Sequence, residues 1–410
     1  MIRTDPHHVR HRLLLWGLSF AAPGLAASGH AEAAEPLTPY ANIRYRIEAI
    51  DQQGLPEDAL ASTLRVRAGV RTDAWNGLSA VVEGETIMPL GAERYNDTAN
   101  GRTNFPIVPD GSGVWLNQAI IRFQPVKEVE AAVGRQAINF DNQRWVGSVD
   151  WRQNDQTLDA ARLSVTPVKN LRVDYVHAWR VNRVFGPDSP IGTWRNNDIH
   201  LARAAATVKQ LGTITAYGWW LDIPDAPGSS SRTLGARLVG EQPLGGGVKL
   251  VYAAEYARQH GIAANPSRAG HDYLLIEPGI AIGKLTLRGG FEELGGNGQT
   301  ALQTPLATAH LFNGWTDRFL TTPAAGLRDV YADVRWQVGP LLTKAPAVLW
   351  LRVHDYRPSG GGARYGREVS GWFTLPIDKR LTGIVKASHY AADSFATDTT
   401  KFWVSLDARF

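Results

Sequence analysis

Alternating apolar and polar residues recur along most of the chain and constrain its fold more than any other feature. In the stretch LRVDYV, residues 171–176, apolar side chains at every second position are separated by charged ones. A period of two residues is typical of a β-strand, whose successive side chains point to opposite faces. The pattern therefore predicts an all-β protein, and it raises the question of which face of each strand meets water.

About eighteen such runs follow one another, each of about ten residues, the length that a tilted strand needs to cross a lipid bilayer. They cover residues 40–50, 61–72, 78–88, 114–124, 129–140, 157–166, 171–184, 198–208, 213–223, 232–242, 248–259, 271–282, 284–294, 327–338, 347–356, 365–376, 381–395 and 401–410. No stretch after residue 35 has the pattern of a long helix. The repetition predicts a transmembrane antiparallel β-barrel of the outer-membrane type, with about eighteen strands.

The links between the runs alternate between short and long. Tight turns fall at residues 76–77, 127–128, 169–170, 210–212, 245–247, 283 and 378–380, whereas most intervening links are longer and rich in Gly, Pro, Asn and Asp. Short turns at one rim and long loops at the other are typical of outer-membrane barrels. We therefore expect a bacterial outer-membrane protein with periplasmic termini, and loops at residues 95–108 and 298–324 that lie outside. The apolar face of residues 171–176 then meets lipid, and Arg172 and Asp174 face the lumen.

The N-terminal segment has the layout of a secretory signal peptide. Basic residues precede the apolar stretch LLLWGLSFAAPGLAA, and small residues follow around residues 31–34. The apolar stretch is too short, and too interrupted by its Pro-Gly pair, for a membrane-spanning helix. We predict a signal peptide over residues 1–33 and a single barrel domain over residues 34–410, although length alone would allow two or three domains.

The composition and the absence of certain motifs exclude several classes of protein. The chain has no Cys, so it can form neither a disulfide nor a thiolate metal site. Its 43 basic residues nearly balance its 39 acidic residues, whereas nucleic-acid binding calls for a concentrated basic face. The 14 Trp and 12 Tyr residues suit membrane interfaces, where such rings collect. The chain has no Gly-x-Ser-x-Gly elbow and its His residues show no metal-ligand spacing, so we expect no enzyme, no metal and no other cofactor.

The charged faces of the predicted strands must point into the lumen, because an Arg on the lipid face at the bilayer midplane costs roughly 2–4 kcal/mol. The predicted pore-lining residues on strands are Arg44, Arg46, Arg65, Arg67, Arg71, Glu83, Glu85, Arg122, Arg135 and Arg162. Two interpretations remain open. Ladders of Arg and carboxylate brace the wall of a wide barrel, or unpaired Arg residues form a track that attracts anions and makes the channel anion-selective.

The segment GRQAINFDNQRWVGSVDWRQNDQTLDAARLS, residues 134–164, is the most distinctive of the chain. Its central part carries Arg144 and Arg152 and is long enough to fold back into the lumen as a constriction loop. Together with Arg135 and Arg162 on the flanking strands, these arginines are predicted to converge on the narrowest point. The alternative is that three nearby Asp residues neutralise them and the segment only braces the wall.

In this segment the chain resembles the alginate export family of outer-membrane barrels. The matching elements are Gly134-Arg135-Gln136, Phe140, Arg144, Gly147, Asp150-Trp151-Arg152-Gln153-Asn154 and Asp159-Ala160-Ala161-Arg162-Leu163. The resemblance implies an eighteen-stranded monomeric barrel whose arginine-rich lumen conducts an anionic polysaccharide. The contributors that it implies are Arg65, Arg67, Arg71, Arg135, Arg144, Arg152 and Arg162. The last strand, which ends in Phe410, also resembles the terminal strand of bacterial outer-membrane proteins.

Two functions remain open from the sequence. The first is a passive channel for anionic polysaccharide or related anionic solutes, and the second is an uptake porin for small sugars or organic acids. The chain is shorter than the alginate exporter itself and its loops are modest, which leaves the particular solute open. As partners we expect the transported anion, outer-membrane lipid and periplasmic export proteins, but no nucleic acid.

Overall fold

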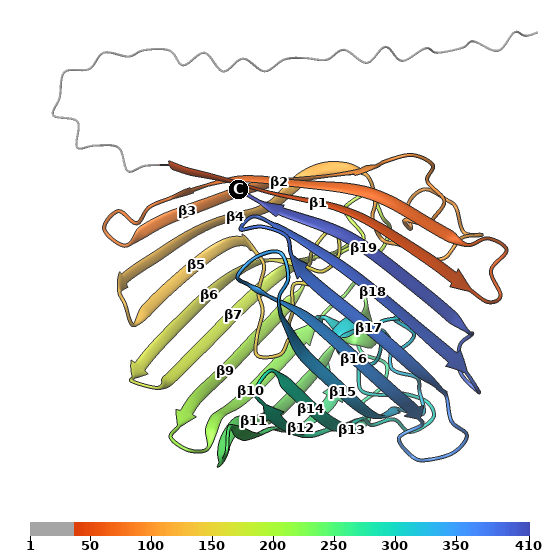
Figure 1. Cartoon of the computed structure of the whole chain (residues 1–410). Coiled ribbons are helices and arrows are strands. Elements are labelled where there is room, and N and C mark those ends of the chain that lie inside the picture. The colour runs from red at the N-terminus through yellow and green to blue at the C-terminus, as the bar shows by residue number, and fades with distance from the viewer. Residues whose placement is uncertain (1–36) are drawn as a thin grey trace, which may run out of the picture. The chain divides into compact units, whose positions relative to one another are not determined.

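The computed structural model describes residues 37–410, which form one antiparallel sheet closed into a barrel (Figure 1). β1 (Leu37–Gln52) pairs with β2 (Ala59–Thr72) on one side and with β19 (Thr399–Arg409) on the other, and this second pairing closes the sheet. The strands between them are β3 (Leu78–Pro89), β4 (Gly113–Val126), β5 (Val129–Gln136), β6 (Thr157–Val168), β7 (Leu171–Asn182), β8 (Thr193–Trp194), β9 (Asp198–Val208), β10 (Gly212–Asp222), β11 (Ser231–Gly245), β12 (Val248–Gly261), β13 (Gly270–Ile282), β14 (Leu285–Leu294), β15 (Leu327–Pro340), β16 (Pro346–Arg357), β17 (Gly366–Pro376) and β18 (Leu381–Ala392).

The wall of the barrel contains eighteen strands. β8 is a two-residue strand within the link between β7 and β9, and β7 pairs directly with β9. Between residues 37 and 410 the only helices are two short 3₁₀ segments, η1 (Pro227–Ser229) and η2 (Ala309–Leu311). No helix in this part of the chain is long and apolar enough to span a membrane. The predicted fold is confirmed, while the predicted signal peptide lies outside the described residues and remains a prediction.

Side chains alternate between the inside and the outside of the barrel. On β1, Arg46 and Glu48 are 3% and 0% exposed, although both are charged. On β3, Val82 is 56% exposed, although it is apolar. On β7, Asp174 is buried and its neighbour Tyr175 is exposed, as the sequence predicts. This reversal of the usual burial pattern is expected for a barrel with lipid outside and a polar lumen.

The two rims of the barrel differ in the length of their links. At the turn rim the links are short. The start of β1 lies beside the end of β2 at this rim, and the backbones of Ala41 and Phe410 are hydrogen-bonded to each other there. The turn-rim links are residues 73–77, 127–128, 169–170, 209–211, 246–247, 283–284, 341–345 and 377–380. Asn76 and Gly77 both have positive φ, which suits the two-residue turn that closes a hairpin between Trp75 and Leu78. The loop-rim links are residues 53–58, 90–112, 137–156, 183–197, 223–230, 262–269, 295–326, 358–365 and 393–398.

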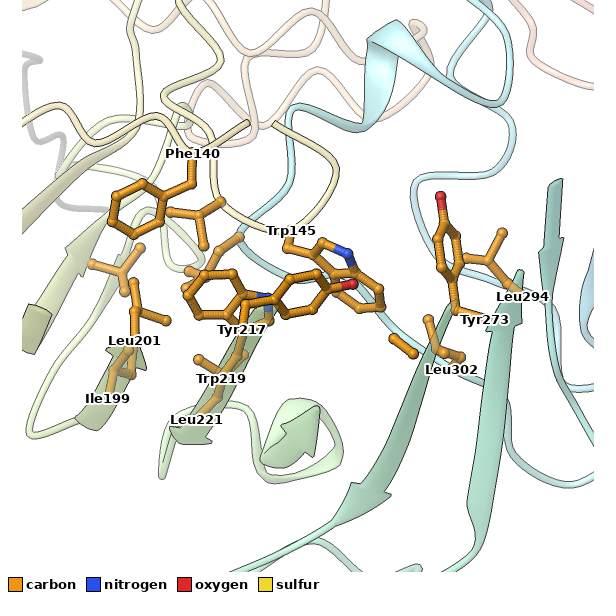
Figure 2. Close-up of a cluster of buried hydrophobic side chains, with 14 of the residues drawn as sticks. Phe140, Trp145, Ile199, Leu201, Tyr217, Trp219, Leu221, Tyr273, Leu294 and Leu302 are labelled. Atoms are coloured by element: carbon orange, nitrogen blue, oxygen red, sulfur yellow. The ribbon is translucent and has the colours of Figure 1, made fainter. Parts of the chain in front are cut away.

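The fifth predicted strand ends earlier than expected. We expect a strand to residue 140, but β5 ends at Gln136 and the chain turns into the lumen. There Phe140 stacks on Trp219 with ring centroids 5.7 Å apart, and Trp145 lies 5.1 Å from Tyr273 (Figure 2). The alternating pattern continues past Gln136 because the loop buries apolar residues inside the barrel rather than in the sheet.

The expectation that residues 298–324 lie outside is wrong for the middle of this segment. Thr308 and Trp315 are each 1% exposed, and Phe319 lies 4.5 Å from Tyr356 between ring centroids. The segment folds back into the barrel and covers inward-facing aromatic residues of β16 to β18. Its exposed residues lie near its two ends, at residues 298–299, 320–321 and 324.

Candidate functional site

Two loops from the loop rim meet inside the lumen and divide it. Residues 137–156 and residues 302–319, which we call the partition, are joined by backbone hydrogen bonds from Gly147 N to Leu306 O at 2.9 Å and from Thr308 N to Gln143 O at 3.0 Å. Deeper in the partition, the rings of Trp151 and His310 stack with centroids 3.6 Å apart. The constriction loop predicted around residue 144 is therefore present, and a second loop that the sequence did not indicate completes it.

The far wall of the barrel anchors the tip of the first loop. Trp145 donates its indole N–H to the Glu255 carboxylate on β12 at 2.6 Å, and the Arg144 guanidinium lies 2.9 Å from the Glu292 carboxylate on β14. All four side chains are buried. Removing one partner of a buried ion pair costs about 3–5 kcal/mol, because a charge is left without compensation. The tip of the first loop is thus fixed across the lumen to β12 and β14.

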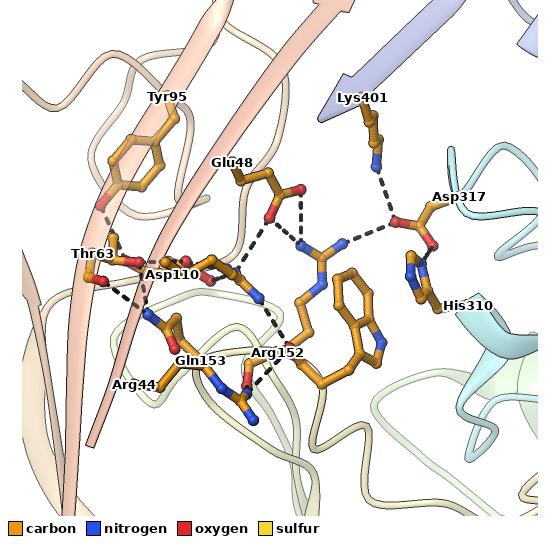
Figure 3. Close-up of polar contacts among 12 residues, drawn as sticks. Arg44, Glu48, Thr63, Tyr95, Asp110, Arg152, Gln153, His310, Asp317 and Lys401 are labelled. Atoms are coloured by element: carbon orange, nitrogen blue, oxygen red, sulfur yellow. Dashed lines mark hydrogen bonds and ion pairs between the residues drawn. The ribbon is translucent and has the colours of Figure 1, made fainter. Parts of the chain in front are cut away.

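Arg152 joins the partition to the first strand of the wall. Its guanidinium lies 3.2 Å from Glu48 and 3.0 Å from Asp317, and Asp317 also accepts from Lys401 at 2.9 Å and contacts His310 at 2.8 Å (Figure 3). These charged groups are almost fully buried. Arg152 therefore links β1 on one side with the second loop on the other.

Four arginines of β1 and β2 donate to consecutive backbone carbonyls of residues 150–153. Arg44 Nη1 reaches the carbonyls of residues 150 and 152 at 2.8 and 2.9 Å, and Arg46 Nη1 reaches that of residue 151 at 3.0 Å. Arg67 Nη2 lies 3.2 Å from the carbonyl of residue 153, and Arg65 bonds to those of residues 152 and 153. Part of the predicted arginine lining therefore suspends the partition from the wall.

Most of the predicted pore-lining arginines have a carboxylate partner. The pairs are Arg44–Asp407, Arg46–Asp110, Arg67–Glu85, Arg67–Asp155, Arg135–Asp159, Arg144–Glu292, Arg152–Glu48, Arg152–Asp317 and Arg162–Glu130. Glu83 accepts hydrogen bonds from Asn117 and Gln118, and Glu85 from Trp115. The expected convergence of the four motif arginines is wrong, because only Arg152 lines a cavity beside the partition. Arg144 is buried against Glu292, and Arg135 and Arg162 bind wall residues.

Three of the predicted arginines form no ion pair with any residue in 37–410: Arg65, Arg71 and Arg122. Arg71 lies over the ring of Tyr40, 5.8 Å from its centroid. Arg65 and Arg71 share a cavity of about 360 Å³ on the turn-rim side of the partition. This arginine cavity is lined by Tyr40, Ala41, Asn42, Arg44, Arg65, Arg67, Arg71, Glu83, Gln118, Asp150, Arg409 and Phe410.

A larger cavity of about 730 Å³, the vestibule, lies on the loop-rim side of the partition. Apolar residues form much of its wall, among them Phe105, Ile107 and Trp194. Asp150 lines the arginine cavity, whereas Trp151 and Arg152, the next two residues, line the vestibule. The segment of residues 150–153 is therefore the wall between the two spaces. A third cavity of about 830 Å³ lies against β9 to β16 on the turn-rim side.

A family model described as alginate export matches residues 39–286, more than half of the chain. The chain belongs to the alginate export family. A search of curated protein sequences finds no significant match. The predicted family is thus confirmed, and the matched residues contain most of β1, all of β2 to β13, the first loop of the partition and the arginines that hold it.

Solved outer-membrane channels share the fold of this alginate export family member. Pseudomonas aeruginosa OccK9 (OpdG) superposes with a TM-score of 0.71 at 12% identity, over 91% of this chain and 98% of that one. P. aeruginosa OccK2 (OpdF) gives 0.69 at 15% identity over the same shares, and Acinetobacter baumannii OccAB2 gives 0.69 at 13%, again over 91% and 98%. At these identities the likeness shows the fold alone. The family and the fold are those of outer-membrane channels.

The sequence did not indicate several residues that shape this channel of the alginate export family. Arg183 and Arg318 line the vestibule, lie in loop-rim links and have no ion-pair partner among residues 37–410. Burial lowers the pKa of Arg183 to about 10, and burial also lowers the pKa of Arg318. Lys401 on β19 completes the basic lining beside Asp317. Of these three residues, only Lys401 could be predicted from the sequence to face the lumen, because the alternation of the predicted last strand directs its side chain inward.

Proposed function

We propose that the protein is a passive outer-membrane channel for small organic anions, with the loop rim at the cell surface and the turn rim in the periplasm. The observation that carries the proposal is the arginine cavity. Its lining contains five arginines against two acidic side chains, Glu83 and Asp150, and Arg65, Arg71 and Arg409 have no ion-pair partner among the described residues. A guanidinium group that has no carboxylate partner can bind the carboxylate of a solute through paired, charge-assisted hydrogen bonds. Positive charge in such a space also raises the local concentration of anions.

The division of the lumen favours a small solute over a polymer. The vestibule and the arginine cavity, at about 730 and 360 Å³, fall within the range of sites for small molecules, about 300–1,000 Å³. The wall between them, residues 150–153, is a single segment held by hydrogen bonds to its backbone carbonyls and by the ion pairs of Arg152 with Glu48 and Asp317. Displacing this segment would join the two cavities, whereas a bulky chain needs both loops of the partition to leave the lumen.

The vestibule favours an anion that also has an apolar body. Phe105, Phe185 and Trp194 line it together with Arg183 and Arg318. Apolar lining with few charged groups is typical of sites that select by shape and place one charge. An aromatic carboxylate has this combination of charge and apolar surface.

Anionic polysaccharide remains a second candidate, because a family described as alginate export matches more than half of the chain. A polyuronate presents one carboxylate per sugar and would engage the same arginines in turn. Its passage requires the partition to open widely. The two candidates therefore differ in how far residues 137–156 and 302–319 must move.

Selectivity and block of single channels in a planar bilayer test the proposal. Under a salt gradient the reversal potential should indicate anion preference, and the preference should weaken near 1 M salt, where the Debye length is about 3 Å. Benzoate should reduce the current at lower concentration than oligouronates do. The double variant R71A/R409A should weaken benzoate block about tenfold, or about 1.4 kcal/mol, and the matched variant R258A should not, since Arg258 pairs with Asp272 on the outer surface.

Each other outcome counts against a specific part of the proposal. Cation preference would contradict an anion channel of either kind. Block by oligouronates but not by benzoate would favour the polysaccharide. Equal effects of R71A/R409A and R258A would mean that the arginine cavity does not bind the solute.

A further inference from the structure

Two histidines and an aspartate meet on the outside of the barrel, away from the lumen. His177 on β7 lies directly opposite His200 on β9 in the strand register, and Asp198 lies two residues before His200 on the same face. Side chains directly opposite each other in an antiparallel pair have Cβ atoms about 4.5–5.5 Å apart. The register therefore brings two imidazoles and one carboxylate together near the loop rim, independently of any loop conformation.

The ligand atoms of this group are spaced for one metal ion. Asp198 Oδ1 lies 2.9 Å from His200 Nε2 and 3.2 Å from His177 Nε2, and one ligand atom from each side chain lies within 4.8 Å of the others. Zinc binds His nitrogen at about 2.0–2.1 Å and carboxylate oxygen at about 2.0–2.2 Å, so tetrahedral ligand atoms lie about 3.3–3.5 Å apart. Small movements of exposed side chains would bring all three atoms to these distances.

The surroundings orient the two rings for metal binding. The His rings stack with centroids 4.8 Å apart and planes inclined by 11°, so that both Nε2 atoms approach the same carboxylate oxygen. Tyr175 Oη lies 2.7 Å from His200 Nδ1. When Nδ1 donates its proton to this hydroxyl oxygen, Nε2 keeps its lone pair for a metal. Such a second hydrogen bond is the usual way in which proteins fix a ligating imidazole.

We propose that His177, Asp198 and His200 form a site for one divalent transition-metal ion of the zinc class. Two imidazoles and one carboxylate suit Zn²⁺ or the neighbouring Ni²⁺ and Cu²⁺, whereas Mg²⁺ and Ca²⁺ prefer sets of oxygen ligands. Three protein ligands leave the fourth position of a tetrahedral site open. The ligands were not found from the sequence because the spacing of His residues along the chain does not reveal a cross-strand pair.

A metal at this site would stabilise one part of the loop rim. His177 precedes the link of residues 183–197 and Asp198 follows it directly, so the metal ties the two ends of this link together. The same link carries Arg183, Phe185 and Trp194 of the vestibule. Metal binding would thus make the vestibule wall more rigid without any contact to the solute. This inference does not depend on the proposed function.

Metal binding to the untagged, chelator-treated, folded barrel in detergent tests the inference. Zinc titration by calorimetry and metal analysis after dialysis should give one Zn²⁺ per chain, and Co²⁺ should give the visible absorption of a tetrahedral centre. H177A and H200A should lose stoichiometric binding, and Y175F should bind about 10–100-fold more weakly. H389A is the matched control, because His389 is also exposed on a strand and hydrogen-bonds only to Thr400 among the described residues.

The results separate a metal site from a simple hydrogen-bonded group. Absence of stoichiometric zinc binding by the native chain would overturn the inference, as would equal binding by H177A, H200A and H389A. Heat-modifiable mobility of each variant shows whether the barrel is folded. If H177A or H200A does not fold, Y175F and the native titration still decide the matter, because neither removes a metal ligand.

Discussion

Whether an arginine of this lumen holds the structure together or stays available to a solute depends on the carboxylate and carbonyl oxygens that lie near it. Arg44 and Arg71 both face inward on neighbouring strands, yet Arg44 bonds to Asp407 and to carbonyls of the partition, whereas Arg71 forms no ion pair with a described residue. The inward direction of both could be predicted from strand period and the cost of charge in lipid. Their pairing could not, because the partners of Arg44 lie far along the chain, on β19 and in residues 137–156.

His310 should make the partition sensitive to pH. Burial and the adjacent ammonium group of Lys386 lower the pKa of His310 to about 3, from an ordinary value of about 6.5. The docked loop therefore holds the neutral ring, and the docked state loses stability as the pH falls below about 6.5, by up to about 1.4 kcal/mol per pH unit. We expect brief opening events to become more frequent between pH 6.5 and 4.5 in single-channel records.

The variant H310Q is the control for this pH response. Gln keeps polar atoms near Asp317 but does not titrate, so its opening frequency should vary little over the same pH range. Burial raises the pKa of Asp317, but the charge of Lys401, the hydrogen bond to the His310 ring and the charge of Arg152 together outweigh it and hold that pKa well below its usual range. Its contribution is lost only below about pH 3.8, outside the window measured. The same pH response in H310Q and the native chain would assign the effect to another group.

At the scale of elements, strands were predictable and the loops that fold inward were not. The β-period and the turn residues indicated β1 to β19 within a few residues, except for the two-residue β8 and the early end of β5. A strand of the barrel can be recognised in the sequence because its residues alternate between two environments, the lipid and the polar lumen. Residues 302–319 have no such period, since their burial depends on aromatic and acidic residues that several distant strands supply.

The anchor at Trp145 should control how firmly the first loop closes the lumen. Truncating a buried Trp to Ala costs about 3–5 kcal/mol, and W145A also leaves Glu255 without its indole donor, although Tyr217 and Arg237 still bind this carboxylate. We expect W145A to fold into the barrel but to show higher single-channel conductance and longer openings. The wall itself should remain intact, because its strands are paired with one another around the whole barrel.

The matched variant for this experiment is W336A. Trp336 is on β15 and 44% exposed on the outer surface, so its loss removes a Trp without touching the partition. Conductance of W336A should equal that of the native channel. If W145A also leaves the conductance unchanged, the second loop alone closes the lumen, and the anchor at Glu255 has no part in gating.

At the scale of the whole molecule, an even number of strands brings both ends of the barrel to one rim. Closure by β1 and β19 places Leu37 and Phe410 beside the short turns. Once the side of the membrane is known for one link, the side of every other link follows. The sequence indicated this arrangement through the alternation of link lengths. The sequence could not show that the longest link, residues 295–326, lies mostly inside the barrel. A test of surface accessibility must therefore avoid residues such as Thr308, which is 1% exposed.

The orientation can be tested with single cysteines, because the native chain has none. Ala99 and Gln299 are exposed at the loop rim, and Lys379 is exposed at the turn rim. If the loop rim faces outward, A99C and Q299C should react with a membrane-impermeant thiol reagent on intact cells. K379C should react only after the outer membrane is opened, as its matched control. Labelling of K379C alone on intact cells would mean that the barrel is inserted the other way, with its vestibule in the periplasm and its arginine cavity at the cell surface.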